Sequence, residues 1–231
     1  MWTKSKRILL IPLTVGIAAL LSIAPVQDTQ AAGCNGSPAE WRITGPGSIL
    51  LDRSLSARSL PKKRADVFNG VQLSRTPRKF ASSIDFRFRD IRGQKGCFQL
   101  SSVHVIVKTE EPYILQLARE LVPGTCVYDV IYNHEYLHAR VLSATIDRIV
   151  ADARAAAAKG TVPSVKKIRN AKSARKFFNG QISKLMNGAI KKHKSDAARS
   201  HKRIDYKSAK AAEQRNCSKA DWARFMKKFG K

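Results

Sequence analysis

The sequence predicts an α+β protein, with a mixed body followed by a basic helical segment. Three observations favour this class. Segments between residues 38 and 125 alternate apolar and polar side chains, which is typical of half-buried strands. The segment from Tyr128 to Lys159 contains neither proline nor glycine, which is typical of one long helix. From Ser164 onward the chain is helical in composition and rich in lysine.

The predicted strands are WRITG, IDFRFRDIRG and CFQLSSVHVIVKT, because each alternates with period two and is bounded by turn residues. The apolar positions that share a face are Ile84, Phe86 and Phe88, and then Val103, Val105 and Val107. Residues 58–80 contain two prolines and a glycine, which predicts a loop with room for a short helix. Residues 111–125 predict a short helix that ends at Pro123-Gly124.

The long predicted helix begins near Tyr128 and stops at Gly160, with Pro163 close behind. Ser218 is the candidate N-cap of a last short helix, SKADWARFMKKF. We expect three parts: a signal peptide at 1–31, a body at 32–155 and a basic helical extension at 156–231.

The first residues have the three-part layout of a secretory signal peptide. Basic residues precede an apolar run from Ile8 to Ala24, and small residues follow in DTQAAG. Cleavage is expected after Ala31 or Ala32, which predicts a secreted or periplasmic protein. A retained membrane anchor is the alternative, but Pro12 and Gly16 interrupt the run. Lipidation at Cys34 is a weaker option.

All four cysteines follow the predicted cleavage site, and an even number outside the cytosol favours two disulfides. Four cysteines allow three pairings. We favour Cys97–Cys126, because both flank the candidate active region, which leaves Cys34–Cys217. Free thiols are the alternative.

The formal net charge is +26, from 43 Lys and Arg against 17 Asp and Glu. Such a charge predicts affinity for polyanions, and most of it lies in residues 151–231. In an exported protein the partner would be anionic lipid head groups, a wall polymer or an acidic protein. Nucleic-acid motifs are absent from the sequence, so no specific nucleic acid is expected. The apolar residues expected to pack this segment on the body are Ile168, Phe177, Phe178, Ile182, Leu185, Met186 and Ile190.

The segment NHEYLHAR, residues 133–140, carries the strongest chemical signal. His134 and His138 are four residues apart, so on a helix they point the same way and can bind one zinc ion. Glu135 lies about 100° further round the helix, where it can take a proton from a zinc-activated water. This arrangement predicts metal-assisted hydrolysis of a carbonyl compound, most simply a peptide bond. The alternative is an ordinary amphipathic helix.

The chain resembles a family of predicted secreted bacterial zinc-dependent proteases of undefined function. Three stretches carry the resemblance: Trp41 to Gly45, Gly96-Cys97 ahead of the strand at 103–107, and Leu121-Val122-Pro123 ahead of the motif helix. More broadly it is similar to zincin metallopeptidases. That resemblance implies a small twisted sheet packed on the motif helix, with His134 and His138 as zinc ligands and Glu135 as catalytic acid/base.

The third zinc ligand is not assigned by any familiar spacing. Val141 and Ala144 occupy the Gly and His positions of the metzincin extension, and the only later glutamate, Glu213, is far along the chain. If the helices form a hairpin at Gly160 to Pro163, residues near 185–190 face the two histidines. His193 then lies about one helical turn beyond those residues, close enough to be a candidate for the third ligand.

His104, on the more polar face of its strand, is a second candidate for this ligand. An aspartate is the third possibility. However, Asp147 lies on the wrong side of the helix, and Asp152 is too far along it.

Two functions follow from these residues. The first is an exported zinc-dependent peptidase that acts on a protein or peptide substrate. The second is a disulfide-stabilised cationic binding protein of the cell envelope or exterior, in which the metal site is structural or decayed.

Overall fold

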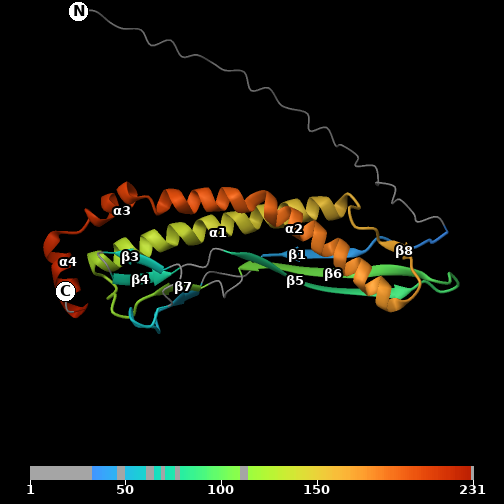
Figure 1. Cartoon of the computed structure of the whole chain (residues 1–231), viewed down its shortest axis with the longest axis horizontal. Helices are drawn as coiled ribbons and strands as arrows, with labels where there is room; N and C mark the ends of the chain where they lie inside the picture. Colours follow the sequence, from blue (N-terminus) through green and yellow to red (C-terminus); the bar gives the residue numbers. More distant parts are fainter. Residues whose placement is uncertain are drawn as a thin grey trace, which may run out of the picture.

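A layer of two long antiparallel helices lies on two small β-sheets in the computed structural model (Figure 1). The structure describes residues 33–45, 50–60, 65–68, 71–75, 79–109 and 114–229. The predicted signal peptide at 1–31 lies outside these residues. The α+β class is confirmed.

The first sheet has the order β1-β6-β5, with β8 also paired to β6. Its strands are β1 (Glu40–Thr44), β5 (Phe80–Asp90), β6 (Cys97–Thr109) and β8 (Val165–Lys167). β5 and β6 form a long antiparallel pair, and β1 runs parallel to β6. Val103, Val105 and Val107 of β6 are buried, and the residues between them are exposed, so the predicted alternation is confirmed.

The second sheet has the order β2-β7-β4-β3. Its strands are β2 (Leu50–Asp52), β3 (Ala65–Phe68), β4 (Val71–Arg75) and β7 (Ile114–Leu117). Two sequence predictions are therefore wrong: residues 111–125 contain β7 rather than a short helix, and residues 58–80 contain the β3–β4 pair rather than a loop. The cause is tertiary, because β7 pairs with both β2 and β4 and buries Leu115 and Leu117.

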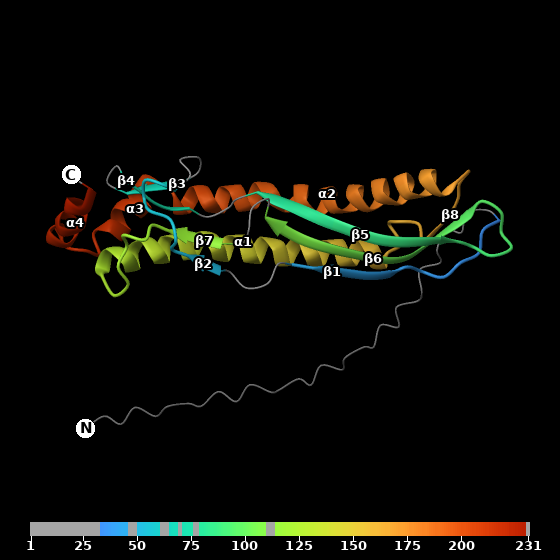
Figure 2. The ribbon, with the colours of Figure 1, turned by 90° about the horizontal axis from the view of Figure 1, so that it is seen from below.

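The predicted long helix is α1 (Cys126–Ala158), so the expected boundary at residue 155 falls inside it. The Thr125 side chain caps its start by accepting a hydrogen bond from the backbone N–H of Tyr128. Gly160, at φ 67°, ends it as the sequence predicts. Figure 2 shows α1 running along both sheets. Its first half packs in the core of the second sheet, and its second half in the core of the first.

After the short strand β8, the chain returns along α1 as α2 (Ala171–Ile204), followed by α3 (Lys207–Gln214) and α4 (Lys219–Met226). The predicted apolar stripe is confirmed: Ile168 lies just before α2 and the other six residues lie on it, and all seven are buried in the core of the first sheet or packed against it. Ser218 caps α4 as predicted, in a capping box with Asp221. The basic segment thus shares its core with the body.

Two disulfides are present, but the favoured pairing is wrong. Cys34 bonds to Cys97, and Cys126 bonds to Cys217. Because β1 runs parallel to β6, the residues before β1 lie beside the start of β6, where Cys97 is. Cys126 instead begins α1, next to the end of α3. Two disulfides are compatible with an exported protein. Among the described helices, none is both long and apolar enough to span a bilayer.

Candidate metal centre

His134 and His138 lie one turn apart on the buried face of α1, as their spacing predicts. Their relative exposures are 1% and 0%. Their rings meet edge to face, with centroids 4.9 Å apart, and the two Nε2 atoms are 3.3 Å apart. Two ring nitrogens therefore converge on one point inside the protein.

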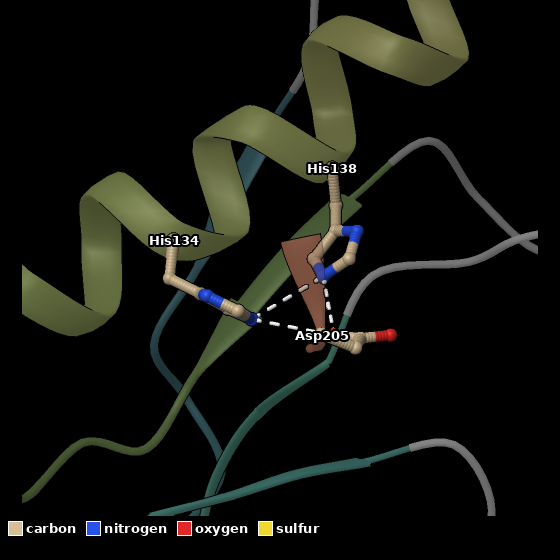
Figure 3. A group of neighbouring side chains, drawn as sticks. All are labelled: His134, His138 and Asp205. Carbon is tan, nitrogen blue, oxygen red and sulfur yellow. Dashed lines mark hydrogen bonds and ion pairs between the residues drawn. The ribbon is translucent and has the colours of Figure 1, made fainter. Parts of the chain in front are cut away.

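Asp205, the residue that caps the C-terminus of α2, is the third member of this group. Its Oδ1 lies 3.0 Å from Nε2 of His138 and 3.5 Å from Nε2 of His134 (Figure 3). All three candidate ligand atoms lie within 4.8 Å of one another, so the group could hold a metal ion.

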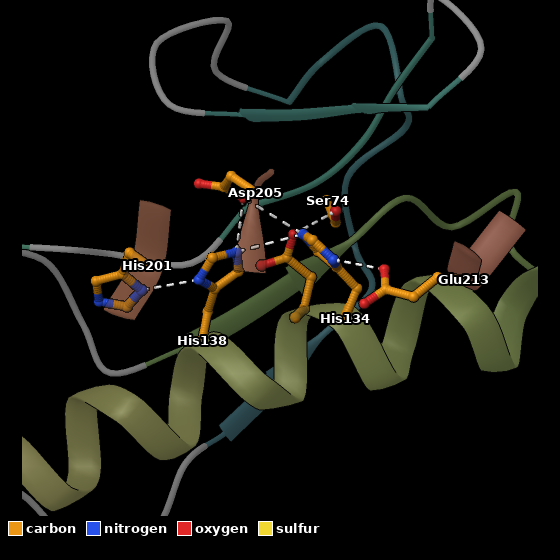
Figure 4. Close-up of polar contacts among 7 residues, drawn as sticks. Ser74, His134, His138, His201, Asp205 and Glu213 are labelled. Atoms are coloured by element: carbon orange, nitrogen blue, oxygen red, sulfur yellow. Dashed lines mark hydrogen bonds and ion pairs between the residues drawn. The ribbon is translucent and has the colours of Figure 1, made fainter. Parts of the chain in front are cut away.

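Each histidine also has a partner at its other ring nitrogen (Figure 4). Oε2 of Glu213, on α3, lies 2.8 Å from Nδ1 of His134, and Nδ1 of His201 lies 2.8 Å from Nδ1 of His138. When Nδ1 of a histidine carries the proton and donates it, Nε2 keeps its lone pair and can bind a metal. Glu213 accepts such a bond as a carboxylate. His201 accepts it when its own proton is on Nε2.

Glu135, the candidate acid/base, is completely buried. The hydroxyl of Ser74, on β4, donates a hydrogen bond of 2.6 Å to its Oε1. Ser74 is itself fully buried. The carboxylate is therefore held between α1 and the second sheet, and the neighbouring strand orients it.

Two earlier candidates for the third ligand are wrong. His104 is exposed on the outer face of β6. His193 points to Asp152 instead, with its Nε2 2.8 Å from Oδ2. Lys192 and His193 together lower the pKa of the Asp152 carboxyl, because both hydrogen-bond to it.

Asp205 was not among the candidates because the register of α2 against α1 differs from the one expected. The hairpin was expected to turn at 160–163, but residues 165–167 pair with β6 and α2 begins only at Ala171. The residues opposite the motif are therefore later in the sequence than expected. One signal in the sequence does point to these residues: His201 and Asp205 are four apart, so on a helix they share a face.

A cavity of about 460 Å³ adjoins the group on the side of α3. It touches His134 and Glu213, and its other walls are polar or apolar residues without a positive charge. These are Cys126, Asp129, Val130, Asn133, Leu137 and Asn216. The two charged residues in the walls of this cavity, Asp129 and Glu213, are therefore both acidic, in a chain that is strongly basic as a whole.

No protein-family model, no curated protein and no solved structure matches this chain. The resemblance to zinc-dependent proteases stays a prediction, and function is inferred below from the geometry of the histidine–aspartate group.

Proposed function

We propose that the protein is a zinc-dependent peptidase in which His134, His138 and Asp205 hold the ion. The observation that carries the proposal is the mutual spacing of their three ligand atoms, 3.0 to 3.5 Å. Zinc binds such atoms at roughly 2.0–2.1 Å, and a tetrahedron with those bonds separates its corners by about 3.3 Å. The three side chains therefore already have the spacing that zinc requires.

The ligand types also suit zinc. Two imidazole nitrogens and one carboxylate oxygen are the ligand set of many catalytic zinc sites, which use three protein ligands and leave one position open. Held there, a zinc ion would polarise a substrate carbonyl and lower the pKa of a water molecule to about 7.

The other steps of the reaction would depend on residues around the ion. Glu135 would accept the proton of the attacking water and later return it to the leaving amine. Ser74 keeps one oxygen of this carboxylate in place. Glu213 and His201 would fix the tautomers of the two histidine ligands, as outer partners of metal ligands commonly do.

The test is hydrolysis of an unstructured protein by the zinc-loaded full chain, followed by mass spectrometry of the products. Glu135→Gln should keep one equivalent of zinc and lower the rate by about 10²–10⁴-fold. Chelation should abolish cleavage, and zinc should restore it. Asp152→Asn is the matched control, because it removes another carboxylate of α1, one that contacts His193 of α2 away from the candidate metal centre. A Glu135→Gln variant as active as the wild type would refute the assigned mechanism.

One observation favours a second function, a cationic binding protein with a structural metal. His134, Glu135 and His138 are all at most 1% exposed, and the group links α1 to the end of α2 and to α3. Structural zinc sites are closed and contribute directly to folding. Stoichiometric zinc together with no cleavage across a broad peptide library would select this function over the first.

A further inference from the structure

The stretch from residue 153 to residue 195 contains twelve Lys and Arg and no Asp or Glu. It includes β8 and most of α2, which lies alongside β5 at this end of the molecule (Figure 2). Its cations cannot be neutralised from within the stretch, so any compensating anion must come from another element or from a ligand.

Three of these cations gather around one hollow of about 370 Å³ between α2 and β5. Lys172, Arg175 and Lys176 share a helical face with Asn179, since they are three, four and seven residues apart. Within the described part of the chain, none of the three cations forms an ion pair. The opposite wall of the hollow consists of Ile84, Asp85 and Phe86 of β5.

Arg175 is held in place by the aromatic residues of β5. Its guanidinium carbon lies 6.0 Å from the ring centroid of Phe86 and 5.5 Å from that of Phe88. Such cation–π contacts orient the guanidinium and leave its N–H groups free to bind an oxyanion through two bonds. The hollow thus has one oriented guanidinium beside the two exposed ammonium groups of Lys172 and Lys176.

We propose that this hollow binds a phosphate group, either as inorganic phosphate or as the monoester head group of an anionic lipid. Arg175 would bind two phosphate oxygens, while Lys172 and Lys176 balance the remaining charge.

This site is separate from the candidate metal centre and independent of the proposed peptidase activity. From Asn179 to Asp205 the rise along α2 is about 39 Å. Removing zinc therefore leaves phosphate binding unchanged, so failure of one proposal does not decide the other.

The test is calorimetric titration of the full chain with inorganic phosphate at low ionic strength. Cosedimentation with phosphatidylcholine vesicles, with and without phosphatidic acid, tests the lipid source. Arg175→Gln and Lys176→Gln should each weaken binding roughly tenfold or more, because each removes a charge-assisted hydrogen bond. The matched controls are Lys184→Gln and Lys191→Gln, which remove the same charge from α2 outside the hollow.

Phosphate binding that is lost only in the hollow variants supports free phosphate as the ligand. Vesicle binding that requires phosphatidic acid and is lost in the same variants supports the lipid head group. The proposal is overturned if the control variants weaken binding as much as the hollow variants, or if neither ligand binds.

Discussion

Replacing Glu213 should weaken zinc binding without removing a zinc ligand. Oε2 of Glu213 lies 2.8 Å from Nδ1 of His134, on the ring side away from the candidate metal position. Loss of such an outer partner commonly reduces metal affinity about 10–100-fold, which corresponds to about 1.4–2.7 kcal/mol. Glu213→Gln keeps an acceptor oxygen and removes only the charge, so we expect its loss of zinc affinity to be near 10-fold. Glu213→Ala removes both, so its loss should be near 100-fold.

The assay is scanning calorimetry of metal-free and zinc-loaded protein at a fixed free zinc concentration. At about 1,000 times the Kd, zinc would stabilise the folded wild type by about 4.1 kcal/mol. In a chain of this length 1 kcal/mol shifts the Tm by about 2–4 °C, so the zinc-dependent shift should shrink by roughly 3–11 °C in the variants.

Asp152→Asn is the control for this comparison, because Asp152 makes the equivalent 2.8 Å contact with His193 away from the candidate metal centre. It should leave the zinc-dependent shift unchanged. Equal shifts in wild type, Glu213→Gln and Glu213→Ala would refute the assignment of Glu213. An equal loss in Asp152→Asn would show that the effect is not local.

Two further predictions concern stability. Replacing Cys126 and Cys217 with serine removes a link across 91 residues, so it should lower the free energy of unfolding in urea by roughly 2–5 kcal/mol. It should also weaken zinc binding, because it frees the segment that carries Glu213. Removing the Cys34–Cys97 disulfide should lower stability without affecting zinc binding. Asp152 has a pKa below its ordinary value through Lys192, so its contribution to stability is present above about pH 4 and is lost as the pH falls through the lowered pKa. Asp152→Asn should therefore show a smaller fall in urea midpoint between neutral and acidic pH, and an unchanged fall would contradict this.

The parts of the fold that the sequence predicts correctly depend on local pattern. The alternation of β5 and β6, the extent of α1 and the Ser218 cap all follow from residues within a few positions of each other. The motif histidines belong to this class, since their common face follows from helical spacing alone. The apolar stripe of α2 was also predictable, because its period indicates a buried face.

The second sheet could not be predicted from local pattern. β7 has residues that are equally suited to a helix, and its strand conformation depends on pairing with β2 and β4 from distant parts of the chain. The prediction of the disulfide pairing was wrong for a related reason, because the pairing depends on which ends of β1, β6, α1 and α3 are adjacent. Both require knowledge of the topology.

The candidate metal centre combines these two cases. α1 supplies its two histidines locally, but Asp205, His201 and Glu213 come from the segment expected to be a basic extension. Which residues of α2 reach the histidines depends on where α2 begins, and that is determined by the pairing of β8 with β6. Packing of the α2 stripe in the core of the first sheet then fixes this register over the first part of the helix, as far as Ile190. The basic segment is therefore required to complete the metal group, and its exposed cationic face remains available for a separate anionic ligand.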